Sequence, residues 1–295
     1  KRTYTWKQVY ERAIKFASAL EKHGVKKGDT VSIMAANTPE LFEAHYSVPM
    51  TGAVLNTINT RLDAKTVSYI LNHADTKVLI VDRQFSPVVN KALETVSKKI
   101  SVIDIIDSQE NLKDAKKIGE FEYESFLNTG NEKFIWKRPD DEWQAISLNY
   151  TSGTTGNPKG VVYHHRGGYL MATGSVTAWN MPNRLNFLYT VPMFHCNGWC
   201  YPWTLAMLHA RVICIRNIRA KEIFELISEH KITHFGGAPI ILNMLANAPK
   251  DEQIKLNHKV YVLTAAAPPP SIIFKKMKEL GFEVMHVYGL SLIHI

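Results

Sequence analysis

Short apolar runs alternate with helical patterns along the chain, and this alternation limits the possible folds more than any other feature. The runs at 30–36, 77–82 and 101–106 show no regular exchange of apolar and polar residues, which is typical of strands buried on both faces. Strands separated by helices indicate parallel sheets with helices on both sides. We therefore predict an α/β fold of stacked, mostly parallel sheets flanked by helices. The other expected strands lie near 144–150, 186–191, 211–215, 233–236, 259–264 and 283–287.

Some helix boundaries can also be predicted. Thr5 fits the N-cap of a first helix, and Gln8 stands where it would close a capping box. Apolar residues then recur at helical spacing until Gly24, which supplies a stop. Pro39 opens a second helical pattern. Residues 108–143 are more polar and weakly periodic, so we expect them to form a surface excursion.

The chain has 295 residues, enough for one large or two modest domains. We expect two subdomains, approximately 1–190 and 191–295, that meet near 185–215. No stretch approaches the roughly 20 consecutive apolar residues that a membrane span needs. The three cysteines lack metal-ligand spacing, which favours a reducing compartment. Cys196 fits a buried or site-lining thiol better than a nucleophile.

The formal net charge is +8, from 35 Lys and Arg against 27 Asp and Glu. A basic balance suits an anionic ligand such as a nucleotide, coenzyme A or RNA. The lysines, however, are scattered in pairs such as Lys26-Lys27 and Lys98-Lys99, which are typical of solvated helix ends. No basic run is interleaved with aromatic residues, so a nucleic-acid partner is not expected.

The segment most informative about function is 150–161, with the sequence Tyr-Thr-Ser-Gly-Thr-Thr-Gly-Asn-Pro-Lys-Gly-Val. Four hydroxyl side chains, three glycines and Lys159 follow directly after the predicted strand 144–150. Glycines let a backbone approach a ligand closely, and consecutive backbone N–H groups with Ser and Thr hydroxyls can hold phosphate oxygens. The pattern therefore predicts a phosphate-binding loop.

A flexible surface loop and a P-loop are the other two interpretations of this segment. A flexible surface loop would explain the composition, but it explains neither the strands on both sides nor a Lys placed by Asn-Pro. A P-loop requires Gly-x-x-x-x-Gly-Lys-Ser/Thr, which does not fit residues 153–160. A P-loop also leads into a helix, whereas residues 160–163 have the pattern of a second strand.

Residues 150–161 resemble the phosphate-binding loop of the adenylate-forming superfamily, which includes acyl-CoA synthetases, beetle luciferases and peptide-synthetase adenylation domains. Segments 191–199, 233–239, 264–270 and 286–291 are similar to the later motifs of this superfamily, in the same order. The resemblance runs across essentially all residues and is closest to plant-type acyl-activating enzymes similar to benzoate–CoA ligases. It implies the large N-terminal domain of the adenylate-forming fold.

The resemblance also implies roles for single residues. His195 and Lys159 are the candidate catalytic residues: His195 would gate the passage between ATP and the acyl pocket. Segment 264–270 would form the turn on which adenine stacks, although Ala265 and Ala266 stand where the family commonly has glycine. The candidate nucleotide-binding residues are Thr151, Ser152, Gly153, Thr154, Thr155, Gly156, Lys159, Ala266, Ala267, Pro268, His286, Tyr288, Gly289 and Ser291. The candidate acid-binding residues are His195, Trp199, Phe235, Gly236 and Gly237.

The pattern departs from the family at its end. The motif should run from Ser291 into a Glu that holds Mg²⁺ against the phosphates, but Leu-Ile-His-Ile follows, so no metal ligand is assigned. We expect the chain to be a partial N-terminal AMP-binding domain over 1–295, truncated at both ends and without the mobile C-terminal domain. Nucleotide binding with little or no turnover is the expectation for this exact chain.

The implied function is ATP-dependent ligation of a carboxylic acid to coenzyme A through an acyl-adenylate. The alternatives are another adenylate-forming enzyme and a non-catalytic nucleotide- or acyl-binding protein. Met193, Trp199 and Phe235 could line a pocket for an aromatic or short-to-medium aliphatic acid, or they could equally pack in a core. Relatives implied by the resemblance are cytosolic or peroxisomal, and the oligomeric state cannot be predicted.

Overall fold

The computed structural model describes residues 2–107, 115–151 and 156–287. The chain divides into two compact units. The first unit holds residues 1–171 and 193–202, and the second holds residues 172–192 and 203–295. Each unit contains one sheet, and each is described by itself below.

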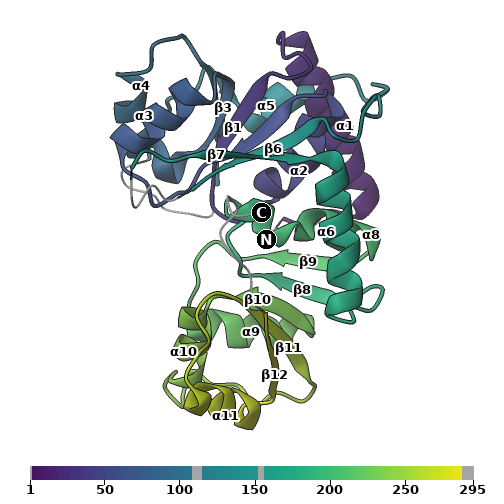
Figure 1. The fold of residues 1–295 in the computed structure, drawn as a ribbon, viewed down its shortest axis with the longest axis vertical. Coiled ribbons are helices and arrows are strands. Elements are labelled where there is room, and N and C mark those ends of the chain that lie inside the picture. Colours follow the sequence, from purple (N-terminus) through teal and green to yellow (C-terminus); the bar gives the residue numbers. More distant parts are fainter. Residues whose placement is uncertain (1, 108–114, 152–155, 288–295) are drawn as a thin grey trace. The chain divides into compact units, whose positions relative to one another are not determined.

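A seven-stranded sheet forms the centre of the first unit (Figure 1). Its order is β5-β4-β3-β1-β2-β6-β7, and all neighbours pair in parallel except β6 and β7, which are antiparallel. The strands are β1 (Thr30–Met34), β2 (Val54–Thr57), β3 (Thr76–Asp82), β4 (Ser101–Ile105), β5 (Phe121–Glu122), β6 (Ala145–Tyr150) and β7 (Gly160–His164). All five residues of β1 are buried, which explains why this strand shows no apolar–polar alternation in the sequence.

Helices flank this sheet in two groups. Helix α1 packs against α2 and α5, whereas α3 packs against α4. The helices are α1 (Trp6–Lys22), α2 (Pro39–Met50), α3 (Ala64–His73), α4 (Ser86–Leu93) and α5 (Tyr123–Asn128), with a short 3-10 turn at Arg83–Phe85. The predicted capping box is confirmed: Gln8 N donates to Thr5 Oγ1 at 3.2 Å, and Thr5 N donates to Gln8 Oε1 at 2.8 Å. Gly24 follows the helix with φ of 89°, which suits the predicted stop.

The expectation that all of 108–143 is a surface excursion is wrong. Strand β5 and helix α5 lie in this stretch, and Tyr123, Phe126 and Leu127 are buried. The ring of Tyr123 stacks on Phe16 of α1, with centroids 4.5 Å apart and 17° between the planes. A helix of six residues is too short to show a period of 3.6, so its apolar face left no periodic signal.

The second unit has a five-stranded parallel sheet in the order β12-β11-β10-β8-β9. Its strands are β8 (Asn186–Tyr189), β9 (Arg211–Cys214), β10 (His234–Gly237), β11 (Val260–Thr264) and β12 (Phe282–His286). Helices α9 (Ala220–His230), α10 (Pro239–Ala246) and α11 (Ser271–Glu279) connect these strands. Helix α6 (His165–Ala178) passes from the first unit into the second, as does α8 (Tyr201–Met207). The predicted α/β class with mostly parallel sheets is confirmed.

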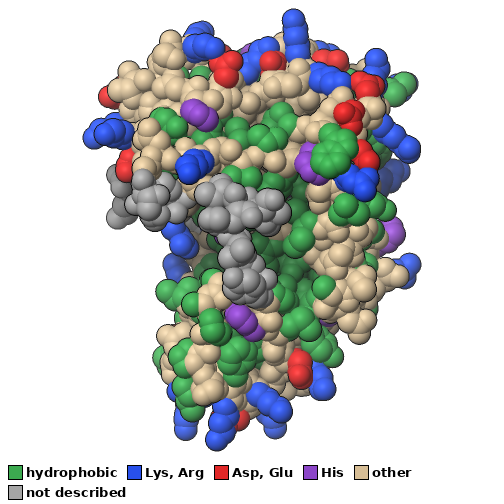
Figure 2. Space-filling model, in the orientation of Figure 1, with side chains coloured by type: hydrophobic (Ala, Val, Ile, Leu, Met, Phe, Trp, Pro, Cys, Tyr) green, Lys and Arg blue, Asp and Glu red, His purple; other side chains and the backbone are tan. Residues whose placement is uncertain are grey.

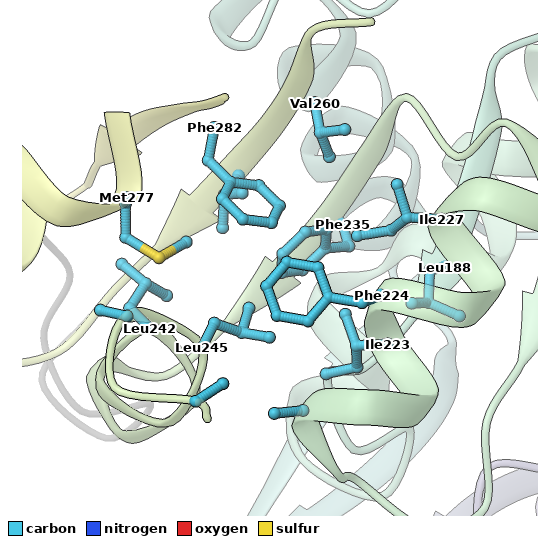
Figure 3. Close-up of a cluster of buried hydrophobic side chains, with 14 of the residues drawn as sticks. Leu188, Ile223, Phe224, Ile227, Phe235, Leu242, Leu245, Val260, Met277 and Phe282 are labelled. Atoms are coloured by element: carbon cyan, nitrogen blue, oxygen red, sulfur yellow. The ribbon is translucent and has the colours of Figure 1, made fainter. Parts of the chain in front are cut away.

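A compact apolar cluster fills the space between this second sheet and its helices (Figure 3). Phe235 of β10 lies edge-on to Phe282 of β12, with centroids 5.9 Å apart and 90° between the planes. The ring of Phe224 on α9 also contacts Phe282, with centroids 6.0 Å apart. The cluster also includes Leu242 and Met277. These side chains are large and fully buried, so they hold α9, α10 and α11 on the sheet.

A buried imidazole makes the stability of the second unit depend on pH. His234 stacks on Tyr261 at 5.0 Å and meets Trp179 edge-on at 5.1 Å. Burial lowers the pKa of His234 to about 4, whereas an unfolded histidine titrates near about 6.5. The unfolded chain therefore binds the proton more readily, so the stability contributed by neutral His234 is complete above about pH 6.5 and is lost as the pH falls toward about 4.

We expect the free energy of unfolding of the second unit to fall over this pH range, by up to about 1.4 kcal/mol per pH unit for this one group. A His234→Gln variant should lose less stability per pH unit than the unchanged protein. Urea unfolding followed by circular dichroism at pH 4.5, 5.5, 6.5 and 7.5 measures both slopes. Equal slopes in the two proteins would assign the acid sensitivity to other groups.

Charged side chains of the first unit occur in mixed pairs. Lys27 contacts Asp140 at 2.7 Å and Arg166 contacts Glu142 at 2.6 Å, and Lys98 pairs with Asp75. On the visible face of this unit, Lys and Arg side chains alternate with Asp and Glu (Figure 2). None of the helices among the described residues is long and apolar enough to cross a bilayer.

Candidate nucleotide-binding site

The predicted phosphate loop lies between two antiparallel strands. Tyr150 at the end of β6 pairs with Gly160 at the start of β7, so the chain reverses direction across the loop. Thr151 N donates to Lys159 O at 3.0 Å, and Lys159 N donates to Thr151 Oγ1 at 3.0 Å. These two bonds close the base of the loop. The strand after the loop, β7, also confirms the prediction that separated this segment from a P-loop.

Side chains at the loop ends have distinct environments. Lys159 and Gly156 are exposed, whereas Pro158 is buried. A Cβ on Gly160 would lie 3.0 Å from Leu148 Cδ1, so a larger residue here would require the Leu148 side chain to shift. Both backbone groups of Lys159 are bonded to Thr151, and its side chain is exposed, where its ammonium could meet an anion. Ser152, Gly153, Thr154 and Thr155 lie outside the described residues.

Tyr150 fixes the end of β6. Its hydroxyl lies 2.8 Å from His73 Nδ1 of α3, and the two rings meet edge-on at 5.7 Å. Burial raises the pKa of Tyr150 to about 12, so the phenol stays neutral and adds no negative charge beside the loop. The residue that precedes the phosphate loop is therefore anchored to a neighbouring helix.

His195 stands at the entrance of a left-handed turn in the first unit. Cys196, Asn197, Gly198, Trp199 and Cys200 all have positive φ, between 49° and 61°. This conformation costs a residue with a side chain about 1–2 kcal/mol, so the four non-glycine residues of this turn require support from the surroundings. His195 O accepts from Gly198 N at 2.8 Å and starts the turn.

The imidazole of His195 lies at the surface. Partial desolvation nevertheless lowers the pKa of His195, so the ring is neutral at physiological pH. Cys196 Sγ lies 3.8 Å from His195 Nε2, but burial raises the pKa of the Cys196 thiol. A raised pKa disfavours the reactive thiolate, which agrees with the interpretation of Cys196 as a site-lining thiol.

The predicted acid-binding residues fall into both units. Trp199 is half-buried in the first unit and meets Tyr201 at a centroid distance of 6.2 Å. In the second unit, Phe235 belongs to the apolar core described above, which matches the packing alternative for this residue. Gly236 and Gly237 are buried at the carboxyl end of β10. A Cβ on Gly237 would lie 3.1 Å from Ile241 Cβ, so helix–strand packing also favours glycine there.

The predicted adenine-stacking turn lies at the carboxyl end of β11. Ala266 has φ of 76°, a conformation that glycine adopts without cost, at a position where the family commonly has glycine. Ala266, Ala267 and Pro268 are exposed and open to a ligand. His286 Nε2 lies 3.1 Å from Ala266 O, so the structure brings these two predicted residues together. Tyr288, Gly289 and Ser291 lie outside the described residues.

Sequence reasoning missed a buried polar network beneath the His195 turn. Asn149 on β6 and Asn197 in the turn bond through their side chains at 2.8 Å, and Thr57 on β2 bonds to Asn149 at 3.1 Å. A single Asn in a strand has no local pattern, and these residues are far apart along the chain. The available signal was Asn149 within the predicted strand 144–150, a polar side chain placed where a core residue is expected.

The resemblance to the adenylate-forming superfamily implies that Mg²⁺ binds together with ATP. The described residues contain no group of three or more His, Cys, Asp or Glu side chains that could hold a metal ion. We therefore assign no Mg²⁺ ligand to the described part of the chain.

Comparisons with known proteins agree with this geometry. The family described as AMP-binding enzyme matches residues 1–291. The chain is 47% identical to the peroxisomal acetate/butyrate–CoA ligase of Arabidopsis thaliana, over 98% of this chain and 53% of that protein. The inhibitor-bound N-terminal domain of FACL13 from Mycobacterium tuberculosis superposes with a TM-score of 0.83 at 26% identity, covering 97% of this chain and 69% of that one.

A more distant likeness shows the fold. The o-succinylbenzoate coenzyme A synthetase of Bacillus subtilis, in complex with ATP and magnesium ion, has a TM-score of 0.80 at 21% identity over 98% of this chain and 55% of that chain. The chain spans about half the length of the curated relatives that it matches, 53% for the Arabidopsis ligase. The match along nearly all its residues, together with the loop between β6 and β7, shows that this chain belongs to the AMP-binding enzyme family.

Proposed function

We propose that the protein containing this chain is an ATP-dependent carboxylic acid–CoA ligase. The observation that carries the proposal is the loop rich in glycine and hydroxyl residues, closed at its base by the two bonds between Thr151 and Lys159. Such a loop presents backbone N–H groups and an exposed ammonium to phosphate oxygens. The identity to the Arabidopsis acetate/butyrate–CoA ligase supports the ligase class.

The proposed reaction has two steps. A carboxylate oxygen attacks the α-phosphorus of ATP, the new O–P bond forms, and the bond to pyrophosphate breaks. The thiol of coenzyme A then attacks the acyl carbonyl, loses its proton, and AMP leaves with the electron pair of the C–O bond. The first step joins two anions, so the protein must neutralise charge and align the reactants.

This chain supplies part of that environment. Lys159 and the loop would hold the departing pyrophosphate, and the exposed turn at Ala266–Pro268 would take the adenine face. Neutral His195 would line the passage without adding a charge that competes for the carboxylate. Mg²⁺ would contribute neutralisation of the phosphate charge, as the magnesium-bound Bacillus relative suggests.

The acid is proposed to be a short-chain aliphatic one. The Arabidopsis relative is named for acetate and butyrate, and the half-buried Trp199 offers an apolar wall suited to a small chain. We also infer that the chain is part of an N-terminal AMP-binding domain and that a separate C-terminal domain completes the active protein. A cytoplasmic or peroxisomal location is in line with the peroxisomal relative.

The test is ATP–pyrophosphate exchange with the protein expressed from the complete coding sequence, using acetate, butyrate, octanoate and benzoate. Exchange with acetate or butyrate, followed by thioester formation when coenzyme A is added, is the expected result. Exchange without any thioester would indicate another adenylate-forming enzyme. Nucleotide binding without exchange for any acid would overturn the ligase proposal and leave a binding protein.

A further inference from the structure

A buried side chain, that of Asn197, ties the left-handed turn at residues 196–200 to strand β6. Asn197 is 0% exposed, and its Oδ1 accepts from Ser147 Oγ at 2.7 Å and from Asn149 Nδ2 at 2.8 Å. Its Nδ2 has no hydrogen-bond partner among the described residues. A buried amide that leaves a donor unpaired is unfavourable, so this Asn is not explained as a means of stabilising the fold.

Thr57 contacts the chain just before this turn, at Phe194. Its hydroxyl lies 3.1 Å from Asn149 Oδ1 and 3.1 Å from Phe194 O. Phe194 precedes His195, and Asn197 follows it by two residues. The chain is therefore bound on both sides of His195: the Phe194 carbonyl to the side chain of Thr57 on β2, and the Asn197 side chain to Ser147 and Asn149 on β6.

The network also reaches the phosphate loop. Asn149 lies on β6 two residues before Thr151, whose hydrogen bonds to Lys159 close the loop. A shift of Asn149 would thus act on both the loop base and the His195 turn. All members of the network belong to the first unit.

We propose that Thr57, Asn149 and Asn197 are positioning residues that fix the orientation of His195 relative to the phosphate loop. The proposal rests on the proposed function, in which His195 lines the passage between ATP and the acyl pocket. They act on His195 through the Phe194 carbonyl before it and through the Asn197 side chain after it. A group that is misplaced slightly loses much of its rate advantage, so these contacts have a measurable kinetic effect.

The first variant is Thr57→Val, which keeps the shape of the side chain and removes both hydrogen bonds of the hydroxyl. We expect a fall of about 10- to 100-fold in kcat for acyl-adenylate formation, with KM for ATP within about threefold. Thr57→Ser retains the hydroxyl and should recover most of the rate. Thr76→Val is the matched control: it removes a buried hydroxyl that bonds Ser32 Oγ at 2.7 Å, and it should leave kcat unchanged.

A double-mutant cycle separates positioning from a general structural effect. In a His195→Ala background, Thr57→Val should lower kcat by less than about twofold, because the group that it positions is already absent. Equal losses in the two backgrounds would overturn the proposal. If Thr57→Val does not fold, Asn197→Gly replaces it, since glycine accepts the φ of 51° at this position.

The proposal can also be tested without any activity. The ring signals of His195 in histidine-labelled protein are identified by their loss in His195→Gln. Thr57→Val should shift or broaden them, whereas Thr57→Ser and Thr76→Val should not. An unchanged His195 signal in Thr57→Val overturns the positioning role. Absence of pyrophosphate exchange in the unchanged protein overturns the ligase proposal instead, so the two failures are distinct.

Discussion

Replacement of Lys159 with Ala is expected to lower the rate of ATP–pyrophosphate exchange by about 10²- to 10³-fold, the usual loss when one preorganised group that stabilises developing negative charge is removed. The Lys159 side chain is exposed beside the phosphate loop. When a bound ligand excludes water, the positive charge of an ammonium interacts strongly with phosphate oxygens. Among the described residues, Lys159 closes the loop base through its backbone N–H and C=O. The variant should therefore keep the shape of the loop base and lose only the charge.

The measurement uses the protein expressed from the complete coding sequence, with the best acid from the panel. Lys117→Ala removes another exposed lysine of the first unit and should change the exchange rate by less than about twofold, while both variants should unfold at the urea midpoint of the unchanged protein. A Lys159→Ala enzyme with an unchanged exchange rate would exclude this residue from pyrophosphate binding. Loss of exchange together with loss of stability would assign Lys159 a structural role.

The long buried strands were predictable because their composition follows from burial on both faces. The expected strand at 77–82 is β3, Thr76–Asp82, and the expected strand at 259–264 is β11, Val260–Thr264. Both carry mostly apolar side chains. Strand β2, Val54–Thr57, was not predicted, because it is four residues long and half of it is Asn56 and Thr57. These polar side chains are buried only because Ser32 and Asn149 lie beside them as hydrogen-bond partners.

The candidate site also has one part that the local sequence reveals and another that depends on residues far apart along the chain. The phosphate loop is a continuous segment, so its hydroxyls, glycines and Lys159 could be recognised together. The Thr57–Asn149 bond joins residues of two different strands, and only the parallel pairing of β2 with β6 brings them together. Phe235 shows the opposite case. It lies within a segment that resembles an acyl pocket, but its side chain faces the core of its unit, and the local sequence does not reveal the face to which a strand residue points in a sheet buried on both sides.

A buried ion network in the first unit leads to the largest stability effect that we predict. Arg12 of α1 donates to Glu43 of α2 at 2.6 and 3.2 Å, and to Glu124 of α5 at 2.6 and 2.9 Å. Tyr123 adds a hydrogen bond to Glu43 at 3.1 Å. The Glu43 side chain is 1% exposed and that of Arg12 is 15% exposed. One guanidinium thus joins three helices around a carboxylate that water does not reach.

The largest free-energy cost arises when one partner of this network is removed, because a buried charge is then left unpaired. Burial raises the pKa of Glu43 to about 7, against the hydrogen bonds and charge of Arg12, which lower it. Without Arg12 the pKa of Glu43 must rise further. A carboxyl whose pKa is higher in the folded state than its usual value loses stability as the pH rises through that folded pKa. The cost of removing Arg12 should therefore grow above about pH 7.

We expect Arg12→Gln to lower the free energy of unfolding of the first unit by about 3–5 kcal/mol near pH 8, the usual cost of leaving a buried charge without its partner. The double variant Arg12→Gln/Glu43→Gln should recover most of this loss, because it removes the unpaired charge. Lys7→Gln, which breaks the exposed contact to Glu11 at 3.8 Å, should cost less than about 0.5 kcal/mol. Urea unfolding by circular dichroism at pH 6 and pH 8 measures all four proteins. A loss below about 1 kcal/mol for Arg12→Gln, or no recovery in the double variant, would show that the three helices are held by their apolar contacts and that the buried ion network contributes little.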